Sequence, residues 1–288
     1  MDDLSASDSY SCTQLRRGDL SLALHVWVGA EPHSVVFYVH GTQSHAGWMF
    51  ETGPALARLG CAVFALDRRG SGASGGARGD VTSFREWCDD YLAAMAVARE
   101  RFPTLPMLLN GQSFGGAIAV GVACDPRACH DALLLSSPLL VPKAGFDLWK
   151  GRPEDEAVHV PTPDEWFTKQ PRYLDFIRQD PLMVRALTRR FQDARIQLAA
   201  HCMALDTPLA NRPCALVLPH TDPMIDLAVA RDVYHRLTGG TGVIIELPGT
   251  DHYLEFSAGQ DLLWRLQAAF ARTFAYSTTQ IAGDSDRS

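Results

Sequence analysis

Short apolar runs alternate with segments of helical periodicity along most of this chain. The runs have the length of buried strands and occupy residues 34–39, 61–66, 105–109, 132–135, 215–218 and 243–247. The helical patterns occupy residues 48–59, 83–102, 226–237 and 262–274. Because strands that alternate with helices form parallel β-α-β units, the sequence predicts an α/β protein with a doubly wound, mostly parallel sheet.

Residues 138–212 interrupt this alternation between two late strands. They are rich in proline, charge and aromatic side chains, and they show helical patterns and loops without a clear strand. We therefore expect an inserted, mainly helical cap at 138–212 and a core formed by 12–137 and 213–276. The ends, 1–11 and 277–288, are rich in Ser and Asp and poor in apolar residues, which predicts frayed tails.

Composition and charge exclude several classes of protein. Hydrophobic residues make up 47% of the chain and charged residues 20%, as in ordinary globular proteins. The net charge is 26 − 33 = −7, and no run of Lys and Arg exceeds two residues. Binding of nucleic acid through a basic surface is therefore not expected.

The sequence also argues against a membrane span and against bound metal. The uncharged run 105–124 has the length of a span, but it contains Asn110, Gln112 and Ser113, so we interpret it as a strand that turns into a buried helix. The seven cysteines lack CxxC spacing, and the N-terminus lacks a secretory signal. We expect free thiols, a cytoplasmic protein, no metal and no organic cofactor.

The strongest local motif is GQSFG at residues 111–115, followed by Gly116. It matches the G-x-S-x-G pattern, in which a serine occupies a sharp turn from a strand into a helix, and small residues are needed where the backbone crowds. The same letters also occur in glycine-rich turns with an incidental serine. Here a strand precedes the motif and an uncharged helix follows it, which favours Ser113 as a nucleophile.

A nucleophilic serine needs a base and an orienting acid, which in this arrangement follow it in the order acid, then histidine. His252 comes directly after the strand 243–247, at the edge of the sheet where Ser113 is also expected. Asp222 follows the preceding strand and is the favoured acid. Asp226 is the alternative acid but suits the N-cap of the next helix, and Asp251 is too close to His252 in sequence.

An oxyanion hole needs two backbone N–H donors. Phe114, the residue after the nucleophile, supplies one of them. The loop after the strand 34–39 supplies the other, and Thr42 is the candidate. We expect His40 in this loop to be structural, with its ring bonded to nearby backbone.

Three further motifs carry a resemblance to a known family. Residues 40–47 (HGTQSHAG) fit an HGxxxHxG loop, residues 67–74 (DRRGSGAS) fit a D-x-R-G-x-G-x-S turn, and residues 180–182 read DPL. Over 17–272 the chain resembles the α/β-hydrolase superfamily, and within it the monoacylglycerol lipase and lysophospholipase branch, often described as serine-aminopeptidase-like. In such a turn Arg68 and Arg69 would brace nearby loops.

The resemblance implies an α/β-hydrolase fold and a lipase-like serine esterase that acts on a small-molecule acyl substrate. The same triad could serve an acyltransferase or a thioesterase of a biosynthetic pathway, and the sequence leaves this alternative open. A binding protein on this scaffold is disfavoured, because all three triad residues are present. Dehalogenases and epoxide hydrolases are disfavoured because they have aspartate at the position of Ser113.

The cap would select the substrate. The residues expected near the pocket are Gln112, Leu139, Leu140, Trp149 and Trp166. The cap's other aromatic residues line an apolar acyl tunnel or form a small core of the cap itself; they include Phe146, Phe167, Tyr173 and Phe176. No dominant phosphate-binding cluster is evident, and the sequence does not indicate an oligomeric state.

Overall fold

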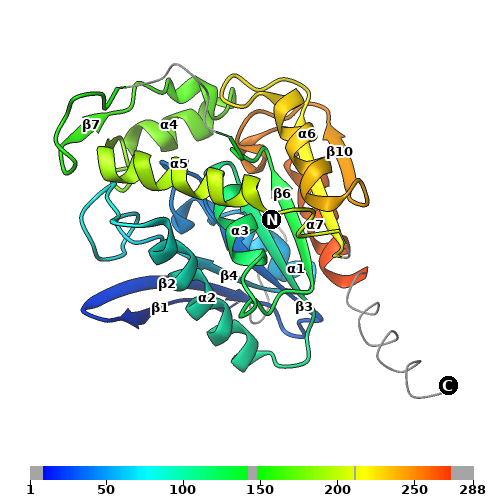
Figure 1. Ribbon diagram of the computed structural model, residues 1–288. Coiled ribbons are helices and arrows are strands. Elements are labelled where there is room, and N and C mark those ends of the chain that lie inside the picture. The colour runs from blue at the N-terminus through cyan, green and yellow to red at the C-terminus, as the bar shows by residue number, and fades with distance from the viewer. Residues whose placement is uncertain (1–8, 142–147, 211, 274–288) are drawn as a thin grey trace.

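The computed structural model describes residues 9–141, 148–210 and 212–273. Within these ranges, one sheet of eight strands has the order β1-β2-β4-β3-β5-β6-β9-β10 (Figure 1). The strands are β1 (Ser9–Arg17), β2 (Leu20–Val28), β3 (Ser34–Val39), β4 (Cys61–Leu66), β5 (Met107–Gln112), β6 (Ala132–Ser136), β9 (Cys214–Pro219) and β10 (Val243–Leu247). β2 runs antiparallel to β1 and β4, and all other neighbours are parallel. The sheet is therefore mostly parallel, as predicted.

Helices cover both faces of this sheet. They are α1 (Thr52–Arg58), α2 (Phe84–Arg101), α3 (Phe114–Ala123), α4 (Pro171–Gln179), α5 (Arg189–Ala204), α6 (Leu227–Thr238) and α7 (Gln260–Thr273). The hydrophobic core on one face includes residues of α2, α3, α5 and α6, and the core on the other face includes residues of α1 and α7.

The pleat of the strands explains why there are two cores. Val35, Phe37 and Val39 of β3 belong to one core, whereas Val36 and Tyr38 belong to the other. Successive side chains of a strand point to opposite faces, so a strand with helices on both faces is apolar throughout. This is why the central strands read as continuous apolar runs in the sequence.

The structure corrects three expectations. The N-terminal tail is shorter than predicted, because residues 9–17 form β1, which pairs with β2 along its whole length. The pattern at 48–59 is not one helix but a 3-10 helix (Ala46–Met49) followed by α1. The inserted segment contains two short strands, β7 (Ala157–His159) and β8 (Ala186–Thr188), which pair with each other. The expected tail at 277–288 lies outside the described residues.

Residues 148–210, within the segment expected to be inserted, lie across the top of the molecule in Figure 1, where β7, α4 and α5 are drawn. The aromatic residues of this segment do not form a core of their own. Phe167 and Phe176 contact Trp48 edge-on, and Tyr173 stacks on Phe256 with ring centroids 4.2 Å apart. Aromatic packing therefore holds this segment on the 3-10 helices Ala46–Met49 and Leu254–Phe256, which follow β3 and β10. Phe146 lies outside the described residues.

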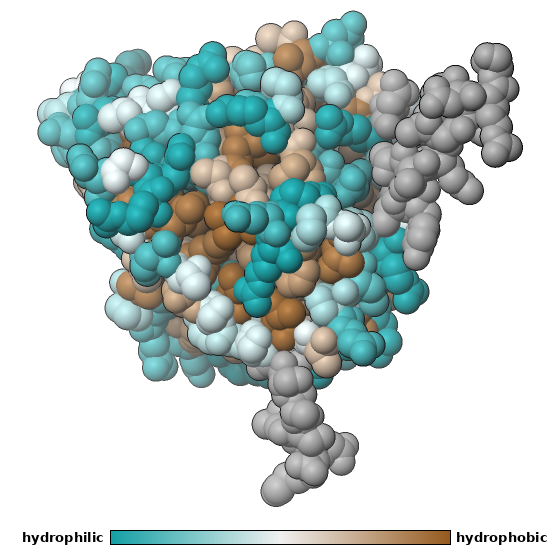
Figure 2. Space-filling view, turned by 90° about the horizontal axis from the view of Figure 1, so that it is seen from below, coloured by the Kyte–Doolittle hydropathy of each residue, from teal (hydrophilic) through white to brown (hydrophobic). Residues whose placement is uncertain are grey.

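The opposite side of the molecule also exposes apolar surface. Seen from below, hydrophobic residues gather near the centre of this face, and hydrophilic residues surround them (Figure 2). Exposed apolar surface is thus not confined to the side that carries the inserted segment.

Candidate active site

Ser113 occupies the turn between β5 and α3, with φ 52° and ψ −124°. A residue with a side chain rarely adopts a positive φ, and such strain persists only where the surroundings fix it. A Cβ atom on Gly115 would lie 2.0 Å from the carbonyl oxygen of Val39, and one on Gly111 would lie 2.7 Å from the Cα of Gly116. Glycine is therefore required on both sides of the serine.

The structure brings together Ser113, His252 and Asp222. Ser113 Oγ lies 3.0 Å from His252 Nε2, and His252 Nδ1 lies 2.7 Å from Asp222 Oδ2. His252 follows β10 and Asp222 follows β9, so both reach the serine from loops at the carboxyl edge of the sheet. Because a carboxylate only accepts, Nδ1 carries the ring hydrogen and Nε2 can accept from the serine hydroxyl.

Asp222 is held in the ionised form that this arrangement needs. Burial by itself would raise the pKa of its carboxyl group, but His252 and two backbone N–H groups outweigh burial and lower that pKa. The backbone donors belong to Met224 and Ile225, which lie 2.8 and 3.0 Å from Asp222 Oδ1. The backbone N–H groups thus orient the carboxylate through Oδ1, and Oδ2 is bonded to the imidazole of His252.

The two other aspartates considered from the sequence have different roles. Asp226 accepts hydrogen bonds from backbone N–H groups in the first turn of α6, as an N-cap does. Asp251 accepts a hydrogen bond from the backbone N–H of Lys169 at 2.9 Å. Asp222 is therefore the acid that reaches the imidazole.

The loop after β3 is fixed by a buried arginine. Arg68 donates to the carbonyl oxygens of His40, Gly41 and Thr42, at 3.4, 3.1 and 2.8 Å. These bonds set the backbone that carries the Thr42 N–H. Phe114 is the first residue of α3, so its N–H has no partner within the helix. Its ring lies in the core, and only its backbone faces the serine turn.

His40 is structural in the way the sequence predicts. Its Nδ1 donates to Gly41 O at 2.9 Å, and its Nε2 accepts from Arg68 N at 3.0 Å. Burial, together with the charge of Arg68, lowers the pKa of His40 well below its usual value. A neutral ring can accept at Nε2, which agrees with this bonding.

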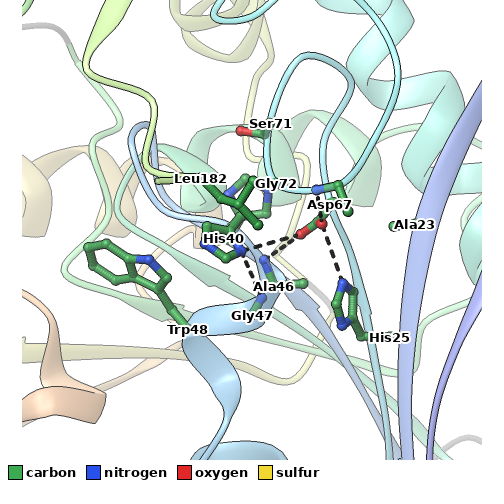
Figure 3. A network of polar contacts seen from close by, with 12 residues as sticks. Ala23, His25, His40, Ala46, Gly47, Trp48, Asp67, Ser71, Gly72 and Leu182 are labelled. Carbon is green, nitrogen blue, oxygen red and sulfur yellow. Dashed lines mark hydrogen bonds and ion pairs between the residues drawn. The ribbon is translucent and has the colours of Figure 1, made fainter. Parts of the chain in front are cut away.

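A second polar group fixes the same loop from the turn after β4. Asp67 accepts from Ala46 N and Ala73 N, both at 2.7 Å, and faces His25 Nε2 at 3.3 Å (Figure 3). Burial opposes ionisation of Asp67, but the hydrogen bond and charge of His25 and the backbone N–H of Ala73 lower its pKa. The two motifs at 40–47 and 67–74 are therefore joined by one buried carboxylate.

Ser113 and His252 line a pocket of about 370 Å³. Of the residues expected there, Gln112, Leu139, Trp149 and Trp166 line it. Leu140 does not, and this expectation was wrong: Leu140 is buried in the main core, whereas its neighbour Leu139 faces the pocket.

The sequence analysis missed several polar residues of the pocket. Gln43 and Ser44 come from the loop after β3, and Gln192 and Arg195 come from α5. The spacing of three residues on a helix could have placed Gln192 and Arg195 on one face. It could not have shown that this face borders the serine, because that depends on how the inserted segment folds back.

In 9–141, 148–210 and 212–273, no group of three or more His, Cys, Asp or Glu residues is placed to hold a metal ion. In the same part of the chain, no helix has the length and apolar character that crossing a membrane requires.

The fold and the order of the site residues define an α/β hydrolase: a mostly parallel sheet, a serine at a strand-to-helix elbow, and an acid and a histidine on later loops. A family model described as serine aminopeptidase, S33, matches residues 30–256. The chain belongs to this family.

Curated relatives match over a shorter stretch. The chain is 32% identical over 122 residues to a monoacylglycerol lipase of Mycolicibacterium smegmatis, which covers 42% of this chain and 44% of the relative. It is 34% identical over 110 residues to the monoglyceride lipase of Rattus norvegicus, covering 38% and 36% of the two proteins. The matched stretches thus span less than half of these relatives.

Solved structures match over nearly the whole chain at low identity. A soluble variant of monoglyceride lipase from Saccharomyces cerevisiae, in complex with a substrate analog, aligns with a TM-score of 0.81 and 14% identity, covering 95% of this chain and 98% of that one. A monoacylglycerol lipase of Paleococcus ferrophilus aligns with a TM-score of 0.70 and 19% identity, covering 89% and 99%. At these identities the likeness shows the fold alone.

Proposed function

We propose that this protein is a serine hydrolase that cleaves a carboxylic ester through an acyl-enzyme. The observation that carries the proposal is the chain of contacts from Ser113 Oγ to His252 Nε2, at 3.0 Å, and from His252 Nδ1 to Asp222 Oδ2, at 2.7 Å. A hydroxyl within reach of an oriented, neutral imidazole is the arrangement that activates a serine. Ser113 and His252 also line the pocket into which a substrate can enter.

In the first half of the reaction, Ser113 Oγ attacks the ester carbonyl carbon while His252 Nε2 takes the hydroxyl proton. The carbonyl oxygen becomes an oxyanion. When the tetrahedral intermediate collapses, the bond to the alcohol oxygen breaks, and His252 gives its proton to that oxygen. Asp222 holds the imidazole and stabilises its charged form.

In the second half, water attacks the acyl-enzyme. His252 takes a proton from the water, and the bond between Ser113 Oγ and the acyl carbon breaks as the serine regains its proton. We assign the oxyanion hole to the backbone N–H groups of Thr42 and Phe114. The second of these lies at the N-terminus of α3, where the helix dipole favours negative charge.

We infer that the substrate is a small acyl ester related to a monoacylglycerol or a lysophospholipid. Leu139, Trp149 and Trp166 give the pocket apolar walls on which an acyl chain can lie. The names of the relatives, monoacylglycerol lipase and monoglyceride lipase, support the same class. We treat residues 138–212 as a cap domain that selects the substrate, and residues 9–137 and 213–273 as the hydrolase core.

We also propose a cytoplasmic location. All seven cysteines are free in the structure, which fits a reducing compartment.

The proposal is tested with a panel of p-nitrophenyl esters, monoacylglycerols and acyl thioesters, assayed with the wild type and with Ser113→Ala. We expect ester hydrolysis by the wild type and a loss on the order of 10⁴-fold or more in Ser113→Ala. Turnover of an ester by Ser113→Ala at the wild-type rate would refute the mechanism. Turnover of thioesters with no turnover of any ester would refute the proposed substrate class.

A further inference from the structure

Helix α5 contributes two polar side chains to the pocket that contains Ser113. Gln192 and Arg195 both line this pocket. They are three residues apart and therefore lie on one face of the helix. Within the described part of the chain, Arg195 Nε and Gln192 Oε1 are buried atoms without a hydrogen-bond partner. Buried polar atoms are normally paired, so these two are available to a ligand.

Arg195, which is half-buried, differs from Arg68, the fully buried arginine of the site. Arg68 is bonded to carbonyl oxygens of the loop after β3, whereas Arg195 has neither a hydrogen bond nor an ion pair among the described residues. Its guanidinium carbon lies 5.4 Å from the ring centroid of Phe114, the residue next to the nucleophile. Burial and the charge of Arg68 lower the pKa of Arg195 to about 10, so it remains a cation at neutral pH.

The rest of the pocket does not neutralise this cation. Among the described residues that line the pocket, none is an aspartate or a glutamate. Two other lining residues, Gln43 and Ser44, also have a buried side-chain atom without a partner, Nε2 and Oγ. Ser44 Oγ lies close to the nucleophile, because a Cβ on Gly41 would be 3.3 Å from Ser44 Oγ and 3.4 Å from Ser113 Cβ.

We propose that Arg195 binds an anionic group of the acyl substrate, a carboxylate or a phosphate. The inference deepens the proposed function and rests on it. A guanidinium presents a planar set of N–H donors that matches both kinds of anion. A half-buried cation that has no ion pair among the described residues gains from a ligand that supplies the missing charge. The anion can belong to the acyl part, as in a dicarboxylic half-ester, or to the alcohol part, as in a phosphorylated glycerol ester.

Two matched pairs of substrates separate these sources. The first pair is the p-nitrophenyl half-ester of adipic acid and its neutral methyl ester, and the second is monooctanoylglycerol phosphate and monooctanoylglycerol. We measure kcat/KM for each member with the wild type, Arg195→Gln and the control Arg189→Gln. Arg189 lies on the same helix and carries the same charge, but it pairs with Glu154 and Asp193 and does not line the pocket.

We expect the wild type to prefer the anionic member of one pair, and that pair identifies the source of the anion. In Arg195→Gln the ratio of anionic to neutral kcat/KM should fall at least about 30-fold, equivalent to about 2 kcal/mol. In Arg189→Gln the ratio should stay within about threefold of the wild type, because that residue is remote from the anion. Ratios unchanged by Arg195→Gln in both pairs, or an equal loss for both members together with a lower Tm, would overturn the proposal.

A binding measurement separates this proposal from the hydrolase proposal. Calorimetry gives the Kd of octyl phosphate, octanoate and octanol for two proteins. One is the Ser113→Ala variant, and the other carries both Ser113→Ala and Arg195→Gln. We expect tighter binding of one anion than of octanol, and a loss of that difference in Arg195→Gln. If no ester is hydrolysed but one anion binds more tightly than octanol, the anion site is supported and the proposed reaction is refuted. If esters are hydrolysed but neither anion binds more tightly than octanol, the anion site is refuted and the hydrolase proposal is unaffected.

Discussion

Asp180→Ala should weaken both the fold and the catalytic loop, because Asp180 ties the inserted segment to the loop after β3. Asp180 Oδ2 accepts hydrogen bonds from His45 Nε2 at 3.0 Å and from Trp48 Nε1 at 2.7 Å. Since His45 Nδ1 accepts from Gly47 N at 3.1 Å, the ring hydrogen is on Nε2, where it points to Asp180. The Asp180 side chain is only 5% exposed.

The size of the effect follows from these contacts. Alanine at this position leaves the indole N–H of Trp48 and the imidazole N–H of His45 without their acceptor. An unsatisfied buried donor costs about 1–3 kcal/mol, so the free energy of unfolding should fall by about 3 kcal/mol. For a protein of this size, each kcal/mol shifts Tm by about 2–4 °C, which gives a Tm lower by about 6–12 °C.

The pH dependence of the variant provides a second measure. Burial opposes ionisation of Asp180, but the bonds from His45 and Trp48 lower its pKa below the usual value. A carboxyl group with a lowered pKa stabilises the fold above its unfolded pKa of about 3.9 and loses this contribution as the pH falls through the folded pKa. The difference in stability between the wild type and Asp180→Ala should therefore be full near neutral pH and shrink below about pH 4.

The loop that contains His45 also carries the Thr42 N–H, so activity should fall as well. A small displacement of a catalytic group costs up to about 100-fold, and we expect kcat to fall by about 10- to 100-fold. The assays are thermal unfolding and ester hydrolysis, with Asp175→Ala as the control, because Asp175 is on α4 and 68% exposed. A Tm within 1 °C of the wild type, together with an unchanged kcat, would refute the reasoning.

Three further predictions concern single residues of the site and its surroundings. Burial raises the pKa of Glu255 to about 7, so the folded state binds more protons than the unfolded state between about pH 4.3 and 7. The free energy of unfolding should therefore fall by about 4 kcal/mol as the pH rises across this range. Glu255→Gln, which keeps an acceptor for Tyr38 Oη, should remove this slope in urea unfolding. Gly115→Ala places a Cβ against Val39 O and should lower the free energy of unfolding by about 3 kcal/mol or more. Asp222→Asn should lower kcat by about 10⁴-fold with an unchanged far-UV circular dichroism spectrum, because the amide no longer holds the imidazole in the working tautomer.

Each of these predictions has an outcome that contradicts it. An equal pH slope in the wild type and Glu255→Gln would show that another group titrates. A Gly115→Ala protein as stable as the wild type would show that the elbow is not crowded. An Asp222→Asn enzyme with more than a tenth of the wild-type kcat would assign the orienting acid elsewhere.

The position of the elbow was predictable because its causes are local. A strand, a sharp turn and a helix follow one another in sequence, and glycines 111 and 115 are needed wherever Cα atoms crowd in this way. The positions of Asp222 and His252 were also predictable, since the carboxyl ends of parallel strands meet at one edge of the sheet. Their distances to each other and to Ser113 needed the structure.

Other features depend on contacts that the local sequence does not encode. β1 is largely exposed and polar, and it exists because its backbone pairs with β2, so side-chain patterns did not reveal it. Leu139 and Leu140 are equivalent in sequence, and only the path of the chain decides which of them reaches the pocket. Arg195 is one of many arginines in the chain, and its unpaired state became visible only when α5 was placed beside the serine.

The central claim is that Ser113 is the nucleophile, and active-site labelling tests it most directly. A fluorophosphonate reacts with an activated serine, and mass spectrometry of the digested protein locates the label. We predict one label per chain, on the peptide that contains Ser113, a loss of ester hydrolysis in proportion to labelling, and no label on Ser113→Ala. Labelling at another residue, or a fully labelled Ser113 in an enzyme that still hydrolyses esters, would contradict the account.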